Sequence, residues 1–182
     1  MDRITLYDKT FKTYIPHEKI LEAVDHVAAN INADFKDCGE IPIILCVLNG
    51  SLIFTAELLT RLNFKCELAS VRMKSYVGLK SSEDVTMAMG ITSDIEDRTV
   101  IIVEDIVDTG NTIEHLKKVL SDNGAKETRV CTLFFKPEAY CKKCAIDYVA
   151  MEIQNQFIVG FGLDYNELGR NYKDIYILDE EA

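Results

Sequence analysis

The chain has 182 residues, of which 48% are hydrophobic and 27% charged, a balance typical of a globular protein with its own core. Its net charge of −10 argues against general binding to nucleic acid or to an anionic membrane. No apolar run approaches the ~20 residues that cross a bilayer, and no signal-peptide pattern opens the chain. We therefore expect a single cytoplasmic domain over residues 1–182 that contacts neither nucleic acid nor membrane.

The six cysteines include one C-x-x-C pair, Cys141 and Cys144. A zinc site needs about four ligands, and no second cysteine pair or histidine pair stands out beside this one. A redox pair remains an alternative, but the favoured interpretation is two unrelated cysteines in a peripheral segment.

The first half of the chain alternates between helix and strand patterns. Residues 1–14 are predicted to form an extended lead-in, and the apolar stripe that follows Pro16 predicts a helix. Its members are Ile20, Leu21, Val24, Val27, Ala28 and Ile31. Residues 43–48 are an uninterrupted apolar run, typical of a strand buried on both faces. A glycine turn over residues 49–51 then leads into a second predicted helix that extends to Leu62.

A third strand is predicted over residues 64–73 and a returning strand over residues 85–91. The polar, Gly- and Ser-containing stretch between them, residues 74–83, has two interpretations. It is either a long exposed hairpin loop or a mobile lid, because long loops in compact domains often carry function.

The most informative stretch begins with the β-branched run of residues 99–103, which predicts another fully buried strand. Glu104 and Asp105 stand at its carboxyl end, and a loop over residues 108–112 leads into a helix that Asn123-Gly124 ends. Ligands of open α/β sheets bind at this edge, and the start of a helix favours a phosphate group.

Three further strands are predicted over residues 129–135, 146–151 and 175–178, and Lys136 follows the first of them. Gly160-x-Gly162 lacks the third glycine of a dinucleotide fingerprint, since Tyr165 stands there, and no helix pattern follows. That interpretation is therefore rejected.

Residues 100–112, VIIVEDIVDTGNT, resemble the phosphoribosyl pyrophosphate (PRPP) motif of type I phosphoribosyltransferases. Residues 48–51 are similar to that family's pyrophosphate loop, which often has a non-proline cis peptide after its leucine, although Asn49 replaces a frequent lysine. Residues 157–170 resemble the hypoxanthine-guanine branch. The resemblance implies an α/β fold: a mostly parallel, twisted core sheet flanked by helices, with a small hood from the terminal segments.

The resemblance also implies the role of each site residue. Glu104 and Asp105 would hold the ribose hydroxyls, directly or through Mg²⁺, and Asp164 would bind metal beside the purine. Asp108 would be the general base or acid at purine N7. The 5′-phosphate would lie on Asp108, Thr109, Gly110, Asn111 and Thr112. Pyrophosphate would contact Leu48, Asn49, Gly50, Ser51 and Arg170. The base would contact Lys136, Phe157 and Ile158, and the flap residues Ser75 and Tyr76 would close over them, with Glu83 where the family's flap usually has glycine.

The implied reaction transfers the 5-phosphoribosyl group from PRPP to N9 of hypoxanthine, with guanine as a second base, and releases pyrophosphate. Two alternatives stay open: an RNA-binding regulator with the same PRPP motif, and a related enzyme that acts on xanthine, adenine or orotate. The acidic charge disfavours the first, and Lys136, opposite a 6-oxo group, disfavours adenine. A homodimer or homotetramer is expected because oligomers are common in the family.

Overall fold

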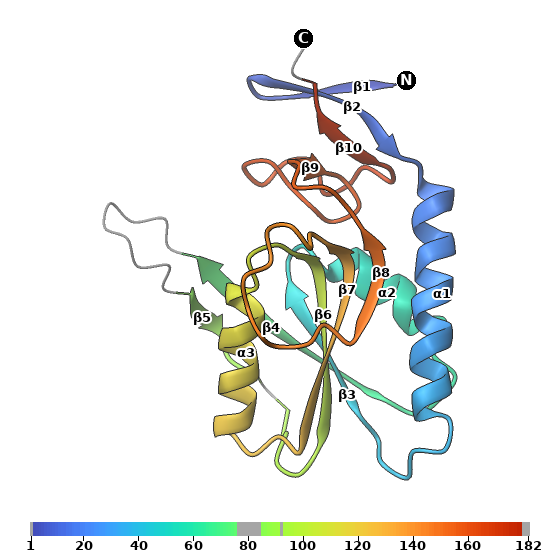
Figure 1. Ribbon diagram of the computed structural model, residues 1–182, viewed down its shortest axis with the longest axis vertical. Helices are drawn as coiled ribbons and strands as arrows, with labels where there is room; N and C mark the ends of the chain where they lie inside the picture. The colour runs from blue at the N-terminus through green and yellow to red at the C-terminus, as the bar shows by residue number, and fades with distance from the viewer. Residues whose placement is uncertain (1, 76–84, 92, 180–182) are drawn as a thin grey trace.

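The computed structural model describes residues 2–75, 85–91 and 93–179, which form two sheets and three helices (Figure 1). The larger sheet has six strands in the order β5-β4-β3-β6-β7-β8, and the smaller has four in the order β1-β2-β10-β9. Figure 1 shows the smaller sheet at one end of the larger one, where it forms the predicted hood.

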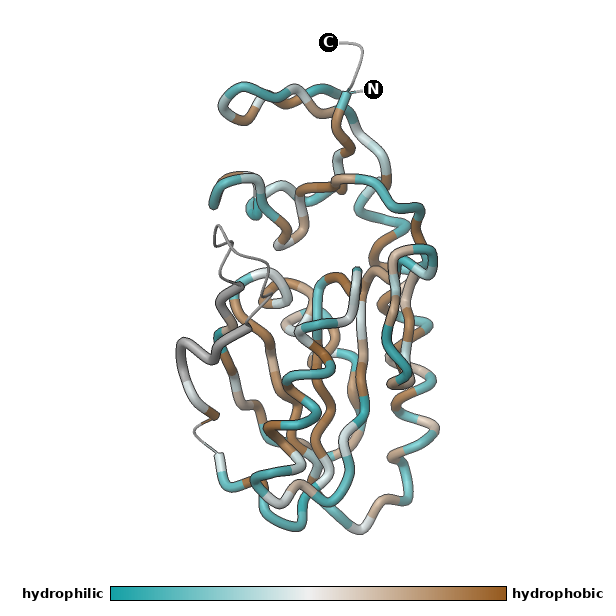
Figure 2. The backbone as a smooth tube through the Cα atoms, turned by 60° about the vertical axis from the view of Figure 1, so that its left-hand side comes forward, coloured by the Kyte–Doolittle hydropathy of each residue, from teal (hydrophilic) through white to brown (hydrophobic). Residues whose placement is uncertain are grey.

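The larger sheet is parallel except for its edge strand β5, which pairs antiparallel with β4. Its strands are β3 (Ile43–Leu48), β4 (Glu67–Ser75), β5 (Val85–Met89), β6 (Thr99–Val107), β7 (Glu127–Phe135) and β8 (Tyr148–Glu152). The central strands β3 and β6 are buried on both faces, which explains their unbroken apolar runs, seen as brown tubes in Figure 2.

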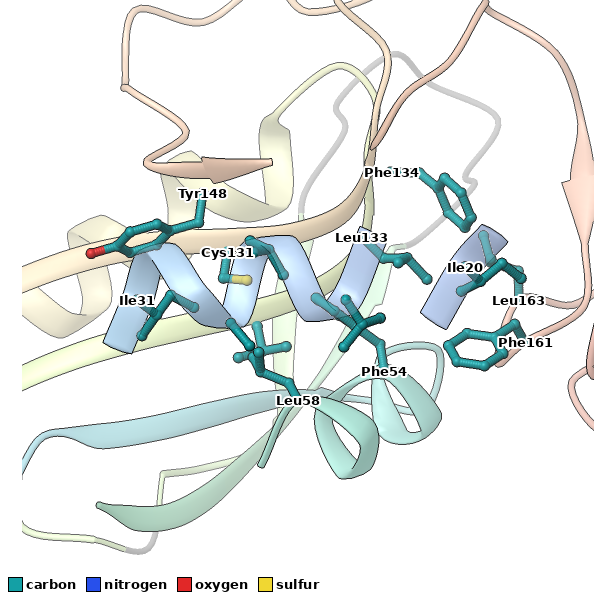
Figure 3. Packing of buried hydrophobic residues seen from close by; sticks show 14 of the residues in the cluster. Ile20, Ile31, Phe54, Leu58, Cys131, Leu133, Phe134, Tyr148, Phe161 and Leu163 are labelled. Carbon is teal, nitrogen blue, oxygen red and sulfur yellow. The ribbon is translucent and has the colours of Figure 1, made fainter. Parts of the chain in front are cut away.

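Helices cover both faces of this sheet. Helices α1 (His17–Phe35) and α2 (Leu52–Leu59) pack on one face, and α3 (Asn111–Asp122) packs on the other. Neighbouring residues of β6 alternate between the two resulting clusters, since Ile101 faces α1 and α2 while Ile102 faces α3. Figure 3 shows the cluster under α1 and α2. Each fully buried Ile, Leu or Phe contributes roughly 1.5–3 kcal/mol to folding.

The hood joins the two ends of the chain. It contains the hairpin β1 (Arg3–Leu6) and β2 (Lys9–Ile15) together with β9 (Ile158–Val159) and β10 (Ile175–Leu178). All pairs are antiparallel, and a small core of Leu6, Phe11, Val159 and Tyr176 lies beneath them. The buried Asp179 carboxylate, directly after β10, pairs with Arg3 at 2.8 Å and with Lys12 at 3.1 Å.

Some predicted boundaries were wrong. The predicted extended lead-in of residues 1–14 is instead largely a hairpin over residues 3–15, with Tyr7 at a positive φ of 51° in its turn. The predicted strand over residues 64–73 begins only at Glu67, because Phe64 leaves the sheet to stack on Phe35, with ring centroids 5.3 Å apart. Helix α2 ends at Leu59 and not at Leu62.

The fold prediction itself is confirmed: a mostly parallel sheet lies between helices, beneath a hood of terminal segments. Within the described ranges, no helix has the length and apolar character to cross a bilayer.

Candidate active site

Three segments meet at the carboxyl edge of the larger sheet, where its parallel strands all end. They are the turn after β3, the end of β6, and a hood loop. A Cβ atom on Gly50 would lie 1.7 Å from Asp105 Oδ2, and a Cβ on Gly162 would lie 2.0 Å from the Gly50 carbonyl oxygen. Glycine is therefore required at both positions, and the hood loop is held directly against the turn.

The turn after β3 contains a cis peptide bond between Leu48 and Asn49, as the family resemblance implies. The side chain of Ser51 is buried. Its buried hydroxyl donates a hydrogen bond to the Val47 carbonyl at 2.8 Å and lies 3.3 Å from Cys46 Sγ. The Ser51 hydroxyl is thus bonded to the backbone of β3. We therefore expect a ligand to contact other groups of this turn.

Glu104 and Asp105 place two carboxylates in a poorly solvated position at the end of β6. Burial, followed by the adjacent Asp105, raises the pKa of Glu104 well above its usual value. No group of the described residues hydrogen bonds to Glu104 Oε2. Burial also raises the pKa of Asp105 to about 6, although Asp105 Oδ1 accepts a hydrogen bond from the Ile106 N–H at 2.9 Å. A bound cation would stabilise the ionised form of both carboxyl groups.

The acid pair supplies two ligands for a divalent metal ion and leaves the rest of its coordination shell to substrate and water. In the described ranges, no three His, Cys, Asp or Glu side chains cluster as a complete metal site. Mg²⁺ commonly binds through one or two carboxylates and completes its shell with substrate oxygens and water. The hard oxygen donors of Glu104 and Asp105 suit that mode.

The loop over residues 108–112 lies at the start of α3. Gly110 caps the helix with a φ of +88°, and Glu114 donates its N–H to the Gly110 carbonyl at 3.0 Å. A Cβ on Gly110 would lie 2.4 Å from Tyr140 Cε2, so no other residue fits without a shift. The N–H groups and partial positive charge at the start of a helix favour an anion here.

Lys136 and Asp108 form an ion pair, with 2.9 Å between Nζ and Oδ2. Lys136 follows β7, and its N–H donates to the Val107 carbonyl of β6 at 3.0 Å, which places its side chain beside the loop that carries Asp108. The Lys136 side chain is only 9% exposed, whereas Asp108 is 45% exposed. Among the described residues, the buried Lys136 ammonium therefore pairs with the Asp108 carboxylate, which is itself open to solvent.

The hood loop over residues 157–170 is held by Arg170. Its guanidinium donates to the Gly162 carbonyl at 2.9 Å, and it pairs with Asp164 at 2.7 Å and with Glu167 at 3.0 Å. The charge of Arg170 lowers the pKa of Asp105 while that of Asp164 raises it, which indicates that both lie near the acid pair.

Phe157 stands at the edge of the hood with 46% of its surface exposed. The ring centroid of Phe11 lies 6.2 Å away, and that of Tyr165 lies 5.9 Å away at an angle of 85°. These two rings hold Phe157 while leaving much of it open. Its neighbour Ile158 is buried in β9 and pairs with Ile177.

Most of the chain matches the model of one protein family. The family model of the phosphoribosyl transferase domain matches residues 11–166. This chain belongs to the phosphoribosyltransferase family.

Individual relatives agree with that assignment and with the predicted hypoxanthine-guanine branch. The chain is 36% identical to the hypoxanthine-guanine phosphoribosyltransferase of Streptococcus pneumoniae strain R6 over 172 residues, which cover 94% of each chain. It is 38% identical to that of Streptococcus agalactiae serotype V over 93% of this chain and 94% of the relative.

Solved structures show the same fold. The hypoxanthine-guanine phosphoribosyltransferase of Bacillus anthracis superposes with a TM-score of 0.86 at 32% identity, covering 92% of this chain and 98% of its own. The hypoxanthine phosphoribosyl transferase of Trypanosoma cruzi does so with a TM-score of 0.87 at 31% identity, covering 97% and 95%.

Most residues predicted for the site of this phosphoribosyltransferase lie at the one sheet edge, and two groups need comment. Ser75 is the last residue of β4, while Tyr76 and Glu83 of the predicted flap lie outside the described residues. The sequence interpretation missed Tyr140 and Lys142, which pack against Gly110. No motif or periodicity marks Tyr140, whereas Lys142 lies within the C-x-x-C pair that was interpreted as peripheral.

Proposed function

We propose that this phosphoribosyltransferase transfers the 5-phosphoribosyl group from PRPP to N9 of hypoxanthine, and also of guanine, and releases pyrophosphate. The observation that carries the proposal is the ion pair between Lys136 and Asp108. The buried Lys136 cation would suit a 6-oxo group, and the Asp108 carboxylate beside it would then face the imidazole side of the same purine.

PRPP would lie along the sheet edge. Glu104 and Asp105 would hold the ribose hydroxyls, and the 5′-phosphate would lie on residues 108–112 at the start of α3. Pyrophosphate would lie between the turn of residues 48–51 and the Arg170 guanidinium, which the contact between Gly50 and Gly162 brings near each other.

Mg²⁺ would be held by Glu104 and Asp105 together with substrate oxygens, and Asp164 would bind metal beside the purine, apart from that pair. When bound, it neutralises the charge of the pyrophosphate leaving group. The raised pKa values of Glu104 and Asp105 support a cation at this position, because unpaired ionised carboxyl groups are costly there.

The purine would stack on the exposed ring of Phe157, and the main chain of Ile158 would contact its edge. Lys136 would donate a hydrogen bond to the 6-oxo group. Ser75 and Tyr76 would close over the reacting centre and exclude water.

The chemistry follows from these positions. The C1′–O bond to pyrophosphate breaks through an oxocarbenium-like transition state, and the N9–C1′ bond forms. Asp108 accepts the proton that leaves N7, and the nearby Lys136 stabilises its carboxylate before that transfer. The products are inosine or guanosine monophosphate and pyrophosphate.

The test is nucleotide formation from PRPP and Mg²⁺ with each of hypoxanthine, guanine, xanthine, adenine and orotate. We expect product from hypoxanthine and guanine, and none from adenine or orotate. Nucleotide formation from adenine alone would contradict the role given to Lys136. We further propose a homodimer or homotetramer, which sedimentation of the purified protein would test.

A further inference from the structure

The segment between β7 and β8 that contains the C-x-x-C pair is not peripheral. It passes over the start of α3 (Figure 1) and contacts the predicted 5′-phosphate loop from behind. A Cβ on Gly110 would lie 2.4 Å from the Tyr140 ring and 2.8 Å from Lys142 Cγ. The segment therefore covers the side of Gly110 on which a side chain would stand.

The first cysteine of the pair is bonded to the same loop. Cys141 donates its N–H to the Thr109 carbonyl oxygen at 3.4 Å, and its Sγ lies 3.3 Å from that oxygen as a second donor. Cys141 is also exposed, so small molecules in solution can reach its thiol.

The second cysteine is tied to the side chain that packs on Gly110. Cys144 Sγ lies 2.8 Å from the Tyr140 hydroxyl, which also donates to the Cys144 carbonyl at 2.5 Å. The Tyr140 ring meets Phe135 edge-on, with 5.3 Å between centroids. Both cysteines are free thiols here, and residues 141–147 belong to no helix or strand, so the backbone between the two can turn.

We propose that Cys141 and Cys144 are a reversible modification site, at which formation of an intramolecular disulfide weakens PRPP binding. The effect on PRPP rests on the proposed function, whereas the disulfide itself does not. Neither cysteine takes part in the proposed reaction, so the role of the disulfide would be regulatory.

The oxidant is a low-molecular-weight disulfide, such as oxidised glutathione. The Cys141 thiol loses its proton and attacks one sulfur of the oxidant, forming a mixed disulfide and releasing one reduced thiol. The Cys144 thiolate then attacks the Cys141 sulfur and releases the second thiol. The two protein thiols lose two electrons and two protons in total, and the oxidant gains them.

Disulfide formation changes the support of the phosphate loop. The Cys141 sulfur must leave the Thr109 carbonyl, and the Cys144 sulfur must leave the Tyr140 hydroxyl. Because Tyr140 and Cys141 contact Gly110 and Thr109, both contacts with the loop change together. We expect the Kd for PRPP to rise about fivefold or more, with the KM for hypoxanthine little affected.

The experiment compares the full-length protein before and after treatment with excess oxidised glutathione. Peptide mass mapping should find a Cys141–Cys144 disulfide as the loss of two hydrogen atoms. Calorimetry with PRPP and Mg²⁺ should show weaker binding, and dithiothreitol should reverse both changes. Cys144→Ser should retain glutathione on Cys141 without forming the disulfide, and Cys38→Ser, which removes a different exposed thiol, should behave like the parent.

Two results would overturn the inference: a folded, oxidant-treated protein without the Cys141–Cys144 disulfide, or a fully oxidised protein with unchanged PRPP affinity. Reduced protein that binds PRPP and makes no nucleotide would instead overturn the proposed reaction and leave the disulfide result standing.

Discussion

Lys136 Nζ lies 2.9 Å from Asp108 Oδ2, so one ion pair joins the end of β7 to the loop after β6. The two strands are neighbours in the sheet, with Val107 in register with Phe135, and this register brings the two side chains to the same edge. The pair links the residue proposed to select the base with the one proposed to move its proton.

Replacing Lys136 should therefore impair the use of the base more than the binding of PRPP. For Lys136→Gln, we expect kcat/KM for hypoxanthine to fall roughly 10²-fold, because a buried charged hydrogen bond to the 6-oxo group is lost. The KM for PRPP should change little. Lys118→Gln, an exposed lysine on α3, is the matched control. A fall in kcat/KM that is equally large for PRPP and for hypoxanthine would contradict this assignment.

Gly50→Ala should disrupt the contact between the turn after β3 and Asp105. Its Cβ would lie 1.7 Å from Asp105 Oδ2, so the turn or the carboxylate must shift. We expect the KM for PRPP to rise about tenfold or more. Steady-state kinetics would measure this beside Gly39→Ala, where a Cβ meets nothing within 4 Å. Unchanged kinetics in Gly50→Ala would show that the turn is not part of the PRPP site.

The pKa of Asp105 predicts a pH-dependent stability. Burial raises this pKa to about 6 from the ordinary value of 3.8, so the folded state binds the proton more tightly than the unfolded state does. The contribution of Asp105 to the free energy of unfolding is therefore most favourable below pH 4 and falls as the pH rises from 4 to 6. The fall should be about 1–2 kcal/mol after allowing for partial exposure.

Asp105→Asn removes this titration and serves as the reference. The difference in unfolding free energy between the variant and the parent should favour the variant more at pH 7 than at pH 4, as urea unfolding in each buffer would measure. A difference that is the same at both pH values would show that burial does not raise this pKa.

The Asp179 carboxylate should stabilise the hood. Asp179→Asn removes the buried carboxylate that pairs with Arg3 and Lys12, and we expect a loss of about 1–3 kcal/mol in hood stability. Hydrogen exchange should accelerate for the amides of β2 and β10, which pair with each other. Asp37→Asn, on an exposed carboxylate, is the control. Equal exchange rates in the two variants would refute this role.

The sequence alone predicted those parts of the fold that depend on local pattern. The runs of β3 and β6 identify buried parallel strands because both faces are covered, and the motif of residues 100–112 placed the acids and the loop at one edge. The stripe after Pro16 likewise predicted α1, apart from Leu21, which is not fully buried.

Contacts between distant segments could not be predicted in this way. The approach of Gly162 to Gly50 and the pairing of Asp179 with Arg3 depend on how the hood folds back on the sheet. Phe64 reads as the start of a strand until its partner Phe35, 29 positions earlier, is known to lie against it. The contact of Tyr140 with Gly110 carries no periodicity or motif at all.

The most direct test of the central claim is formation of inosine monophosphate from PRPP, Mg²⁺ and hypoxanthine by the parent and by Asp108→Asn. The control is Asp122→Asn, on an exposed aspartate at the far end of α3. The parent and the control should form inosine monophosphate and pyrophosphate in equal amounts, and Asp108→Asn should be slower by about 10²–10⁴-fold. Tight PRPP binding without any nucleotide from the parent, or full activity in Asp108→Asn, would contradict the account.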